Sequence, residues 1–170
     1  MCVLFRIAQL REDAYWHRRC TCRGVMKPAF FDLSAVDLES VAGGAASCAI
    51  AGDSIAYGLG TQMKQCTTNA KVGTPSHDII HRVPQGFTGL TIISAGSNDP
   101  MNPHLADNLN AMRRRAGGGV TWIAPVNPRA RSVVESVAHA HGDRVVTFTP
   151  GHDNVHPQSY AALARAVQGH

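Results

Sequence analysis

The sequence predicts an α/β fold in which a parallel β-sheet is covered by helices on both faces. From residue 46 onward, short apolar runs alternate with segments of helical periodicity, and this alternation is typical of consecutive βα units. The strand-like runs are apolar at nearly every position, as in Ile92-Ile93 and Val145-Val146. Such runs are expected when both faces of a sheet are buried. Five units fit into the chain only with short loops, so we expect one compact domain.

Five strands are predicted from the apolar runs. Glycines follow the first three runs at Gly52, Gly73 and Gly96, and Pro125 stops the fourth. Glycine and proline are the residues that most often mark turns. We therefore place the strands at residues 46–51, 68–72, 90–95, 120–124 and 144–148.

Five helices are predicted after the strands. The third has the clearest period, with Leu105, Leu109 and Met112 at helical spacing. The fourth ends before Gly142, a residue that suits a helix C-terminus. We place the helices at residues 55–66, 75–83, 103–115, 130–141 and 157–167.

The first 46 residues differ from the rest of the chain. They mix aromatic, charged and cysteine residues without sustained periodicity. We therefore expect an extension over residues 1–46, partly ordered at best, followed by a domain over residues 47–170. Arg6 and the charged run 11–13 interrupt the apolar start, so it does not read as a secretion signal. No apolar run is long enough to span a membrane, and the default expectation is a cytoplasmic location.

The charge pattern does not predict binding to nucleic acid. The net charge is +4, from 16 basic and 12 acidic residues. The basic residues are spread along the chain, and only Arg113-Arg114-Arg115 forms a run of three. Such a run suits a solvated helix end, whereas nucleic-acid binding calls for a larger basic patch.

The five cysteines do not form a recognisable framework. Their odd count and irregular spacing do not predict a set of disulfides. Cys20 and Cys22, near His17, could be zinc ligands. A single C-x-C pair is weak evidence for a zinc site, so free thiols are favoured there.

Two other patterns suggest ligands only weakly. His77 and His81 lie four residues apart on a predicted helix and could chelate a metal, but no third ligand at helical spacing completes the site. Gly58 and Gly60 resemble part of a phosphate loop, but the lysine and Ser/Thr that complete such a loop are absent. We therefore expect no metal and no cofactor.

The first candidate site residue is Ser54. The first strand ends at Gly52, Asp53 and Ser54 follow, and a helix begins directly after them. Ligands of open α/β sheets bind at the carboxyl ends of the strands, and a helix N-terminus favours a developing negative charge. Ser54 is therefore a candidate nucleophile. The alternative is that Asp53 and Ser54 only cap the helix, as these residue types often do.

Three more loops bring suitable partners to the same edge. His156 is the candidate base that would remove the proton of Ser54, and Asp153 would orient it. The backbone N–H groups of Ser54 and Gly73, with the side-chain amide of Asn98, are candidate donors to an oxyanion. Together these residues supply the parts that acyl transfer needs.

This set of motifs resembles the SGNH hydrolases, also called the GDSL esterase/lipase family. The resemblance covers residues 49–170, and its motifs occur in the order that the family has. It implies a flavodoxin-like, three-layer α/β/α sandwich with a five-stranded parallel sheet, and it implies hydrolysis of esters or thioesters. The matching segments are Gly52-Asp53-Ser54, Gly73, Gly96-Ser97-Asn98-Asp99 and Asp153-Asn154-Val155-His156-Pro157.

The chain departs from the family pattern in three respects. Ile55 stands where the family name implies leucine, which keeps the apolar character. The interval from Asn98 to Asp153 is short for the family, so the loops that form substrate pockets are expected to be reduced. Ser54 also lies far from Met1, whereas the family usually carries its nucleophile near the mature N-terminus. No catalytic group is lost through these departures.

These observations predict a serine esterase that acts on a small acyl ester. Reduced loops would leave an open rim rather than a deep apolar tunnel, so we expect a small-molecule or glycan ester as substrate, with O-acetyl groups on a carbohydrate or cell-envelope glycan as one candidate. The alternative is a catalytically silent ligand-binding or assembly module on the same fold. The sequence does not indicate an oligomeric state.

Overall fold

The computed structural model describes residues 47–169. The expected extension over residues 1–46 lies outside the described residues, together with Cys2, Cys20 and Cys22.

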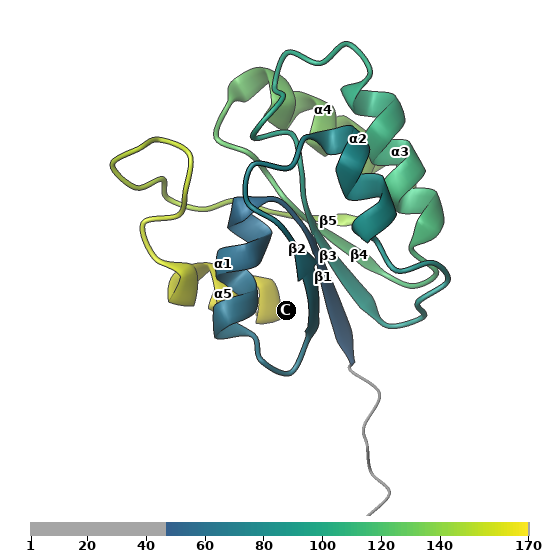
Figure 1. Cartoon of the computed structure of the whole chain (residues 1–170), viewed down its shortest axis with the longest axis horizontal. Helices are drawn as coiled ribbons and strands as arrows, with labels where there is room; N and C mark the ends of the chain where they lie inside the picture. The colour runs from purple at the N-terminus through teal and green to yellow at the C-terminus, as the bar shows by residue number, and fades with distance from the viewer. Residues whose placement is uncertain (1–46, 170) are drawn as a thin grey trace, which may run out of the picture. The chain divides into compact units, whose positions relative to one another are not determined.

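Five parallel strands form a single sheet, as the sequence predicts. Their order across the sheet is β2-β1-β3-β4-β5, which is the flavodoxin-like order. All five strands run in the same direction, so their carboxyl ends meet at the upper edge in Figure 1. The strands are β1 (Cys48–Gly52), β2 (Thr67–Ala70), β3 (Leu90–Ser94), β4 (Val120–Ile123) and β5 (Arg144–Val146).

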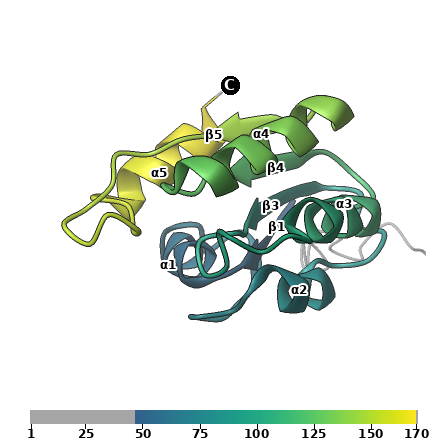
Figure 2. The ribbon, with the colours of Figure 1, turned by 90° about the horizontal axis from the view of Figure 1, so that it is seen from above.

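Helices cover both faces of the sheet and complete the three layers (Figures 1 and 2). One face carries α1 (Ser54–Gln62) and α5 (Tyr160–Gln168), which pack against each other. The other face carries α2 (Ser76–Ile79), the 3₁₀ turn η3 (Ile80–Arg82), α3 (Leu105–Arg115) and α4 (Pro128–His141).

The sheet separates two apolar cores. Neighbouring side chains along a strand point to opposite faces, so Ile92 of β3 packs with α1 and α5, whereas Ile93 packs with the three helices opposite. Both side chains are fully buried. The continuous apolar runs of the sequence therefore follow from burial on both faces.

The structure corrects the ends of several predicted elements. The predicted second helix is divided into α2 and η3, and η3 ends at Arg82 because Val83 precedes Pro84 and is held in an extended conformation. The last helix begins at Tyr160 rather than at Pro157, since the hydroxyl of Ser159 caps it by accepting the N–H of Ala162 at 3.2 Å. The strands β2 and β5 are also shorter than predicted, at 67–70 and 144–146.

Gly52 allows β1 to end against β3. Its φ is +149°, and a Cβ built on it would overlap the carbonyl oxygen of Ser94. Any side chain at this position would therefore force β1 and β3 apart. This close approach places the residue after the turn, Asp53, directly behind the end of the sheet, where it is completely buried.

The structure contains one disulfide that the cysteine pattern did not predict. Cys48 and Cys66 are joined by a disulfide, and both residues are buried. They precede the paired residues Ala49 and Thr67 of the neighbouring strands β1 and β2. Their pairing depends on strand register, which the spacing of cysteines in the sequence does not reveal.

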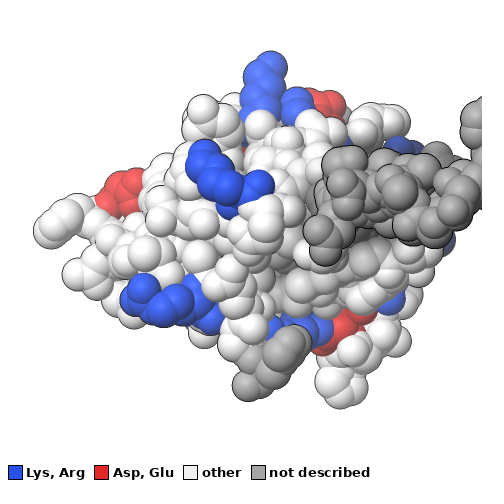
Figure 3. Space-filling model, turned by 90° about the horizontal axis from the view of Figure 1, so that it is seen from below, with Lys and Arg blue, Asp and Glu red and all other residues white. Residues whose placement is uncertain are grey.

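No helix in the described part of the chain is long and apolar enough to cross a membrane. Figure 3 shows the face seen from below, opposite the carboxyl ends of the strands. On the described surface of that face, Lys and Arg side chains lie at separate positions, and Asp or Glu side chains lie beside some of them.

The disulfide predicts a stability that depends on redox conditions. It closes a segment with a sequence separation of 18 residues, and closing a loop of this size stabilises a domain by about 3 kcal/mol. We expect reduction, or the double substitution Cys48→Ser/Cys66→Ser, to lower the melting temperature by on the order of 10 °C. Thermal unfolding with and without reductant measures the change.

The double variant is its own control, because reductant should not shift its melting temperature further. Equal melting temperatures for the oxidised wild type and the double variant would contradict a stabilising role of the disulfide.

Candidate active site

The structure brings Ser54, His156 and Asp153 into one hydrogen-bonded chain. The Nε2 atom of His156 lies 2.8 Å from Oγ of Ser54. The Nδ1 atom of the same ring lies 2.5 Å from Oδ2 of Asp153. When Nδ1 donates to the carboxylate, Nε2 is left to accept the hydroxyl proton of Ser54, which is the tautomer that base catalysis needs.

The loop between β5 and α5 holds Asp153 and His156 in this arrangement. Oδ1 of Asp153 accepts the backbone N–H groups of Val155 at 3.0 Å and His156 at 2.9 Å. Asn154 turns the chain with a φ of 54°, a conformation that asparagine tolerates better than most residues. The hydrogen bond from the His156 ring, followed by those from the two backbone N–H groups, holds the pKa of Asp153 well below its usual range. Asp153 therefore stays ionised, and the exposure of 53% of its side chain to solvent also favours the charge.

Asp53 and Ser54 have different roles in the turn after β1. Asp53 is the N-cap of α1, and its Oδ1 accepts the N–H of Ile55 at 3.0 Å. Ser54 is the first residue of α1, and its hydroxyl faces His156. The capping alternative is therefore correct for Asp53, while the Ser54 side chain is directed to the triad.

Asp53 is an acidic side chain without contact with solvent. The hydroxyl of Ser94 donates to Oδ1 at 2.8 Å, whereas Oδ2 has no hydrogen-bond partner among the described residues. Burial raises the pKa of Asp53 despite these hydrogen bonds. The hydroxyl of Ser97 and the N–H of Ala56 lie close enough to lower this pKa in part. The net effect is still a raised pKa, because burial of Asp53 has the largest effect.

The predicted oxyanion donors lie on three loops of the same edge. The N–H of Ser54 is at the start of α1, where the first N–H groups of a helix have no partner within it. Gly73 has a φ of +74°, and a Cβ built on it would meet no atom within 4 Å, so this backbone lies open. The side-chain amide of Asn98 donates one hydrogen to the carbonyl oxygen of Thr74 at 3.0 Å. An amide carries two hydrogens, so the second is left for a ligand.

A polar network around Asp99 supports the Asn98 loop, as the sequence predicts, although its partners were not predicted. Oδ2 of Asp99 accepts both the N–H and the hydroxyl of Ser76, at 3.1 and 2.5 Å. Asn102 donates to the same oxygen at 2.9 Å, and Asn108 donates to the Ser76 hydroxyl at 2.8 Å. These bonds tie the loops after β2 and β3 to α3. Their members are up to 32 residues apart in the chain, so no local motif announces them.

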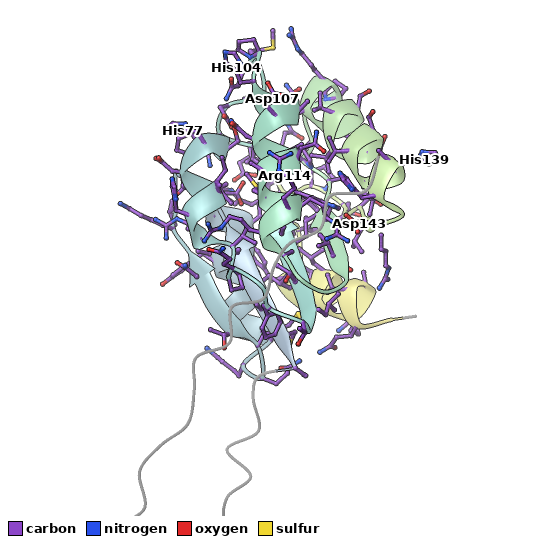
Figure 4. The ribbon with its side chains drawn as sticks, turned by 90° about the vertical axis from the view of Figure 1, so that its right-hand side faces the viewer. His77, His104, Asp107, Arg114, His139 and Asp143 are labelled. Atoms are coloured by element: carbon purple, nitrogen blue, oxygen red, sulfur yellow. A yellow bond between two sulfur atoms is a disulfide. The ribbon has the colours of Figure 1, made fainter. Side chains whose placement is uncertain are left out.

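The histidines that suggested a metal lie away from the triad. His77 is exposed on α2 and contacts Asp78 at 3.1 Å. In Figure 4, His77 on α2 and His139 on α4 point outward from the helical layer, as do His104 and Asp107 near the start of α3. Within residues 47–169, no group of three potential ligands could hold a metal ion.

Two open hollows border the triad. One, of about 320 Å³, lies between the loops after β3, β4 and β5. The other, of about 380 Å³, lies beside Asp153 and His156 on the outer side of their loop. The first hollow has mixed apolar and polar walls, formed by Ser97, Pro100, Val126, Asn127, Pro128, Asn154 and Val155.

This arrangement can activate a hydroxyl and stabilise negative charge beside it. A serine, an imidazole and a carboxylate in hydrogen-bond contact form a nucleophile with its base and orienting group. Comparison of the sequence with models of known families gives no match. Comparison with curated proteins likewise gives no significant match. The function of this site is therefore inferred from the fold class and from the residues described above.

The geometry predicts different pH behaviour for Asp153→Asn and Asn98→Ala. An amide at residue 153 would donate to Nδ1 of His156 and leave Nε2 protonated towards Ser54, so kcat should fall by up to about 10⁴-fold. Part of that loss should be recovered at high pH, where hydroxide can replace the base. Asn98→Ala removes a donor and no proton acceptor, so kcat should fall by about 10² to 10³-fold without recovery.

A pH–rate profile for each variant on a p-nitrophenyl ester measures the difference. Equal recovery of both variants, or an effect of Asn98→Ala on KM alone, would remove Asn98 from the oxyanion hole.

The burial of Asp53 predicts that its charge destabilises the fold. Its folded pKa is raised, so the unfolded chain gives up the proton more readily, and stability falls as pH rises from about 4. Asp53→Asn keeps an oxygen that can accept from Ile55 and Ser94, and its amide can donate to Ser97. We expect Asp53→Asn to melt at a higher temperature than the wild type at about pH 7, with a smaller difference near about pH 4.

Thermal unfolding of both proteins across this pH range measures the difference. A variant that is less stable than the wild type at every pH would show that the hydrogen bonds of Asp53 fully offset the cost of burying its charge.

Proposed function

We propose that this chain is a serine esterase of the SGNH type that acts on small acyl esters. The observation that carries the proposal is the chain of two hydrogen bonds from Asp153 through His156 to Ser54, of 2.5 and 2.8 Å. Its location at the carboxyl edge of a flavodoxin-like sheet supports the proposal, because ligands of such sheets bind at this edge.

In the first half of the reaction, Oγ of Ser54 attacks the carbonyl carbon of the ester while Nε2 of His156 takes the hydroxyl proton. Negative charge then develops on the former carbonyl oxygen. The N–H groups of Ser54 and Gly73 and the free amide hydrogen of Asn98 stabilise this charge. The tetrahedral intermediate collapses as His156 returns the proton to the departing alcohol, which leaves an acyl group on Ser54.

In the second half, water takes the place of the alcohol. His156 removes a proton from the water as its oxygen attacks the acyl carbon, and it then protonates Oγ of Ser54 as the carboxylic acid leaves. Asp153 remains ionised throughout and stabilises the imidazolium that forms in each half. Its lowered pKa is consistent with that role.

The surroundings of the triad favour a short acyl group. Ala124–Asn127 is the whole connection between β4 and α4, so this loop adds little depth to the hollow beside the triad. The same hollow presents Asn127 and Asn154, whose amides can hydrogen-bond to hydroxyl groups. These features support an O-acylated carbohydrate, including a cell-envelope glycan, as a substrate class.

The disulfide bears on where the enzyme works. Disulfides persist mainly in oxidising compartments and are rare in the cytosol. We infer an oxidising location from the Cys48–Cys66 bond, in place of the cytoplasmic default that the sequence suggested.

Hydrolysis of p-nitrophenyl esters of graded chain length, beside a panel of acetylated glycans, tests the proposal. We expect kcat/KM to be highest for acetyl esters and to fall with chain length, because the hollow is open and shallow. Ser54→Ala should lower the rate by several orders of magnitude and prevent covalent labelling by a fluorophosphonate.

Ser132→Ala is the matched control, since Ser132 is an exposed serine on α4, a helix on the opposite face of the sheet from α1. Wild-type protein that neither hydrolyses any ester nor becomes labelled would favour the silent binding module. Full labelling of Ser54→Ala would remove Ser54 from its role, and a steady rise of kcat/KM with chain length would contradict a shallow site.

A further inference from the structure

The loop that carries Asp153 and His156 is attached to the body of the domain mainly at its two ends. Gly151 N–H donates to the carbonyl of His156 at 2.7 Å, and Gln158 N–H donates to the carbonyl of Thr149 at 2.9 Å. Both bonds join one side of the loop to the other. Among the described residues, the hydrogen bond from this loop to another loop of the site is the one from His156 to Ser54. Its position is therefore set by β5 at one end and α5 at the other.

Tyr160 is the first residue of α5, and its ring occupies a space that exists only because residue 58 is glycine. A Cβ built on Gly58 of α1 would overlap Cζ of Tyr160 and would lie 2.7 Å from its hydroxyl oxygen. Tyr160 packs against the apolar core that α1 and α5 share. Burial raises the pKa of Tyr160, and the charges of Asp53 and Asp153 add to this effect, so the ring lies close to the turn and the loop that form the site.

Glycine at residue 58 lowers the stability of α1. A helix with glycine in its interior is less stable than one with alanine, and Gly58 lies in the middle of α1 with a φ outside the left-handed region. Backbone conformation therefore does not require glycine at this position. The close contact with Tyr160 requires glycine at this position. This contact, and not a phosphate loop, explains the glycine at residue 58.

We propose that the contact between Tyr160 and Gly58 positions His156 against Ser54. The expected effect of this contact on catalysis rests on the proposed function. Gly58 lies one helical turn after Ser54, and Tyr160 lies four residues after His156. The contact therefore joins α1, which carries the proposed nucleophile, to α5, which begins where the loop of His156 ends. A side chain at residue 58 would displace the ring of Tyr160, and we infer that the start of α5 and His156 shift with it. A misplacement of about 1 Å in an active site can cost about 10²-fold in rate.

Gly58→Ala and Gly60→Ala form a matched pair of variants. Both add one methyl group to α1 at a former glycine. A Cβ at Gly60 would lie 2.5 Å from Oγ1 of Thr68, a residue of the exposed edge strand β2. The second variant therefore introduces a comparable clash that does not involve α5.

We expect Gly58→Ala to lower kcat for an acetyl ester by about 10²-fold with little change in KM. Gly60→Ala should lower kcat by no more than a few fold. Thermal unfolding of both variants at the assay temperature and above verifies that each is folded. An equal loss of kcat in the two variants, or a loss seen only in KM, would overturn the proposal.

Variants of Tyr160 separate packing from chemistry. Tyr160→Phe keeps the ring and should retain most of the wild-type kcat, whereas Tyr160→Ala should lose about as much as Gly58→Ala. Adding Gly58→Ala to Tyr160→Ala should cause little further loss, because the methyl group then enters the vacated space. Fully additive losses, or a loss in Tyr160→Phe as large as in Tyr160→Ala, would contradict positioning by the ring.

A measurement independent of turnover separates this inference from the proposed function. Cross-peaks between the His156 ring and the Ser54 methylene in NMR spectra report their contact directly. They should be present in the wild type and in Gly60→Ala and absent or much weaker in Gly58→Ala. A wild type with these cross-peaks and no esterase activity would refute the proposed function alone, while unchanged cross-peaks in Gly58→Ala would refute the positioning role.

Discussion

The hydrogen bond between His156 and Ser54 is the contact on which the candidate site depends. It joins residues 102 positions apart in the sequence, and their strands β5 and β1 are separated in the sheet by β3 and β4. A rigid parallel sheet makes the contact possible, because it fixes the ends of all five strands at one edge. The loop after β5 then has to span the remaining distance, and the packing of α5 against α1 determines where that loop ends.

Much of this arrangement could be predicted from the sequence. Apolar runs buried on both faces, closed by glycine or proline, identify the strands, and parallel strands necessarily share a carboxyl edge. The order of strands and loops alone therefore brings Ser54, Asp153 and His156 to one edge, although their catalytic roles remain predictions. The different roles of Asp53 and Ser54 in the turn after β1 could not be predicted. Whether Asp53 or Ser54 caps the helix depends on side-chain directions, which follow from the approach of Gly52 to Ser94.

The features that sequence reasoning missed are contacts between distant residues. The Cys48–Cys66 bond depends on the register of β1 and β2, and the Ser76–Asp99 bond depends on the meeting of two loops that follow β2 and β3. Gly58 looked like a remnant of a phosphate loop because its neighbour in space, Tyr160, is 102 positions away in the sequence. In each case the residue types are ordinary, and only the fold gives them a partner.

The distribution of the site along the chain has a consequence for its synthesis. A domain folds as a unit, and the part of the chain that forms β1 and α1, with Ser54 at the helix start, is synthesised before the other strands and helices described. The base that would activate this serine belongs to the loop before α5, the last helix within residues 47–169. A nascent chain that has not yet released α5 from the ribosome therefore carries an inert serine. The proposed hydrolytic activity would therefore appear only after α5 has docked against α1.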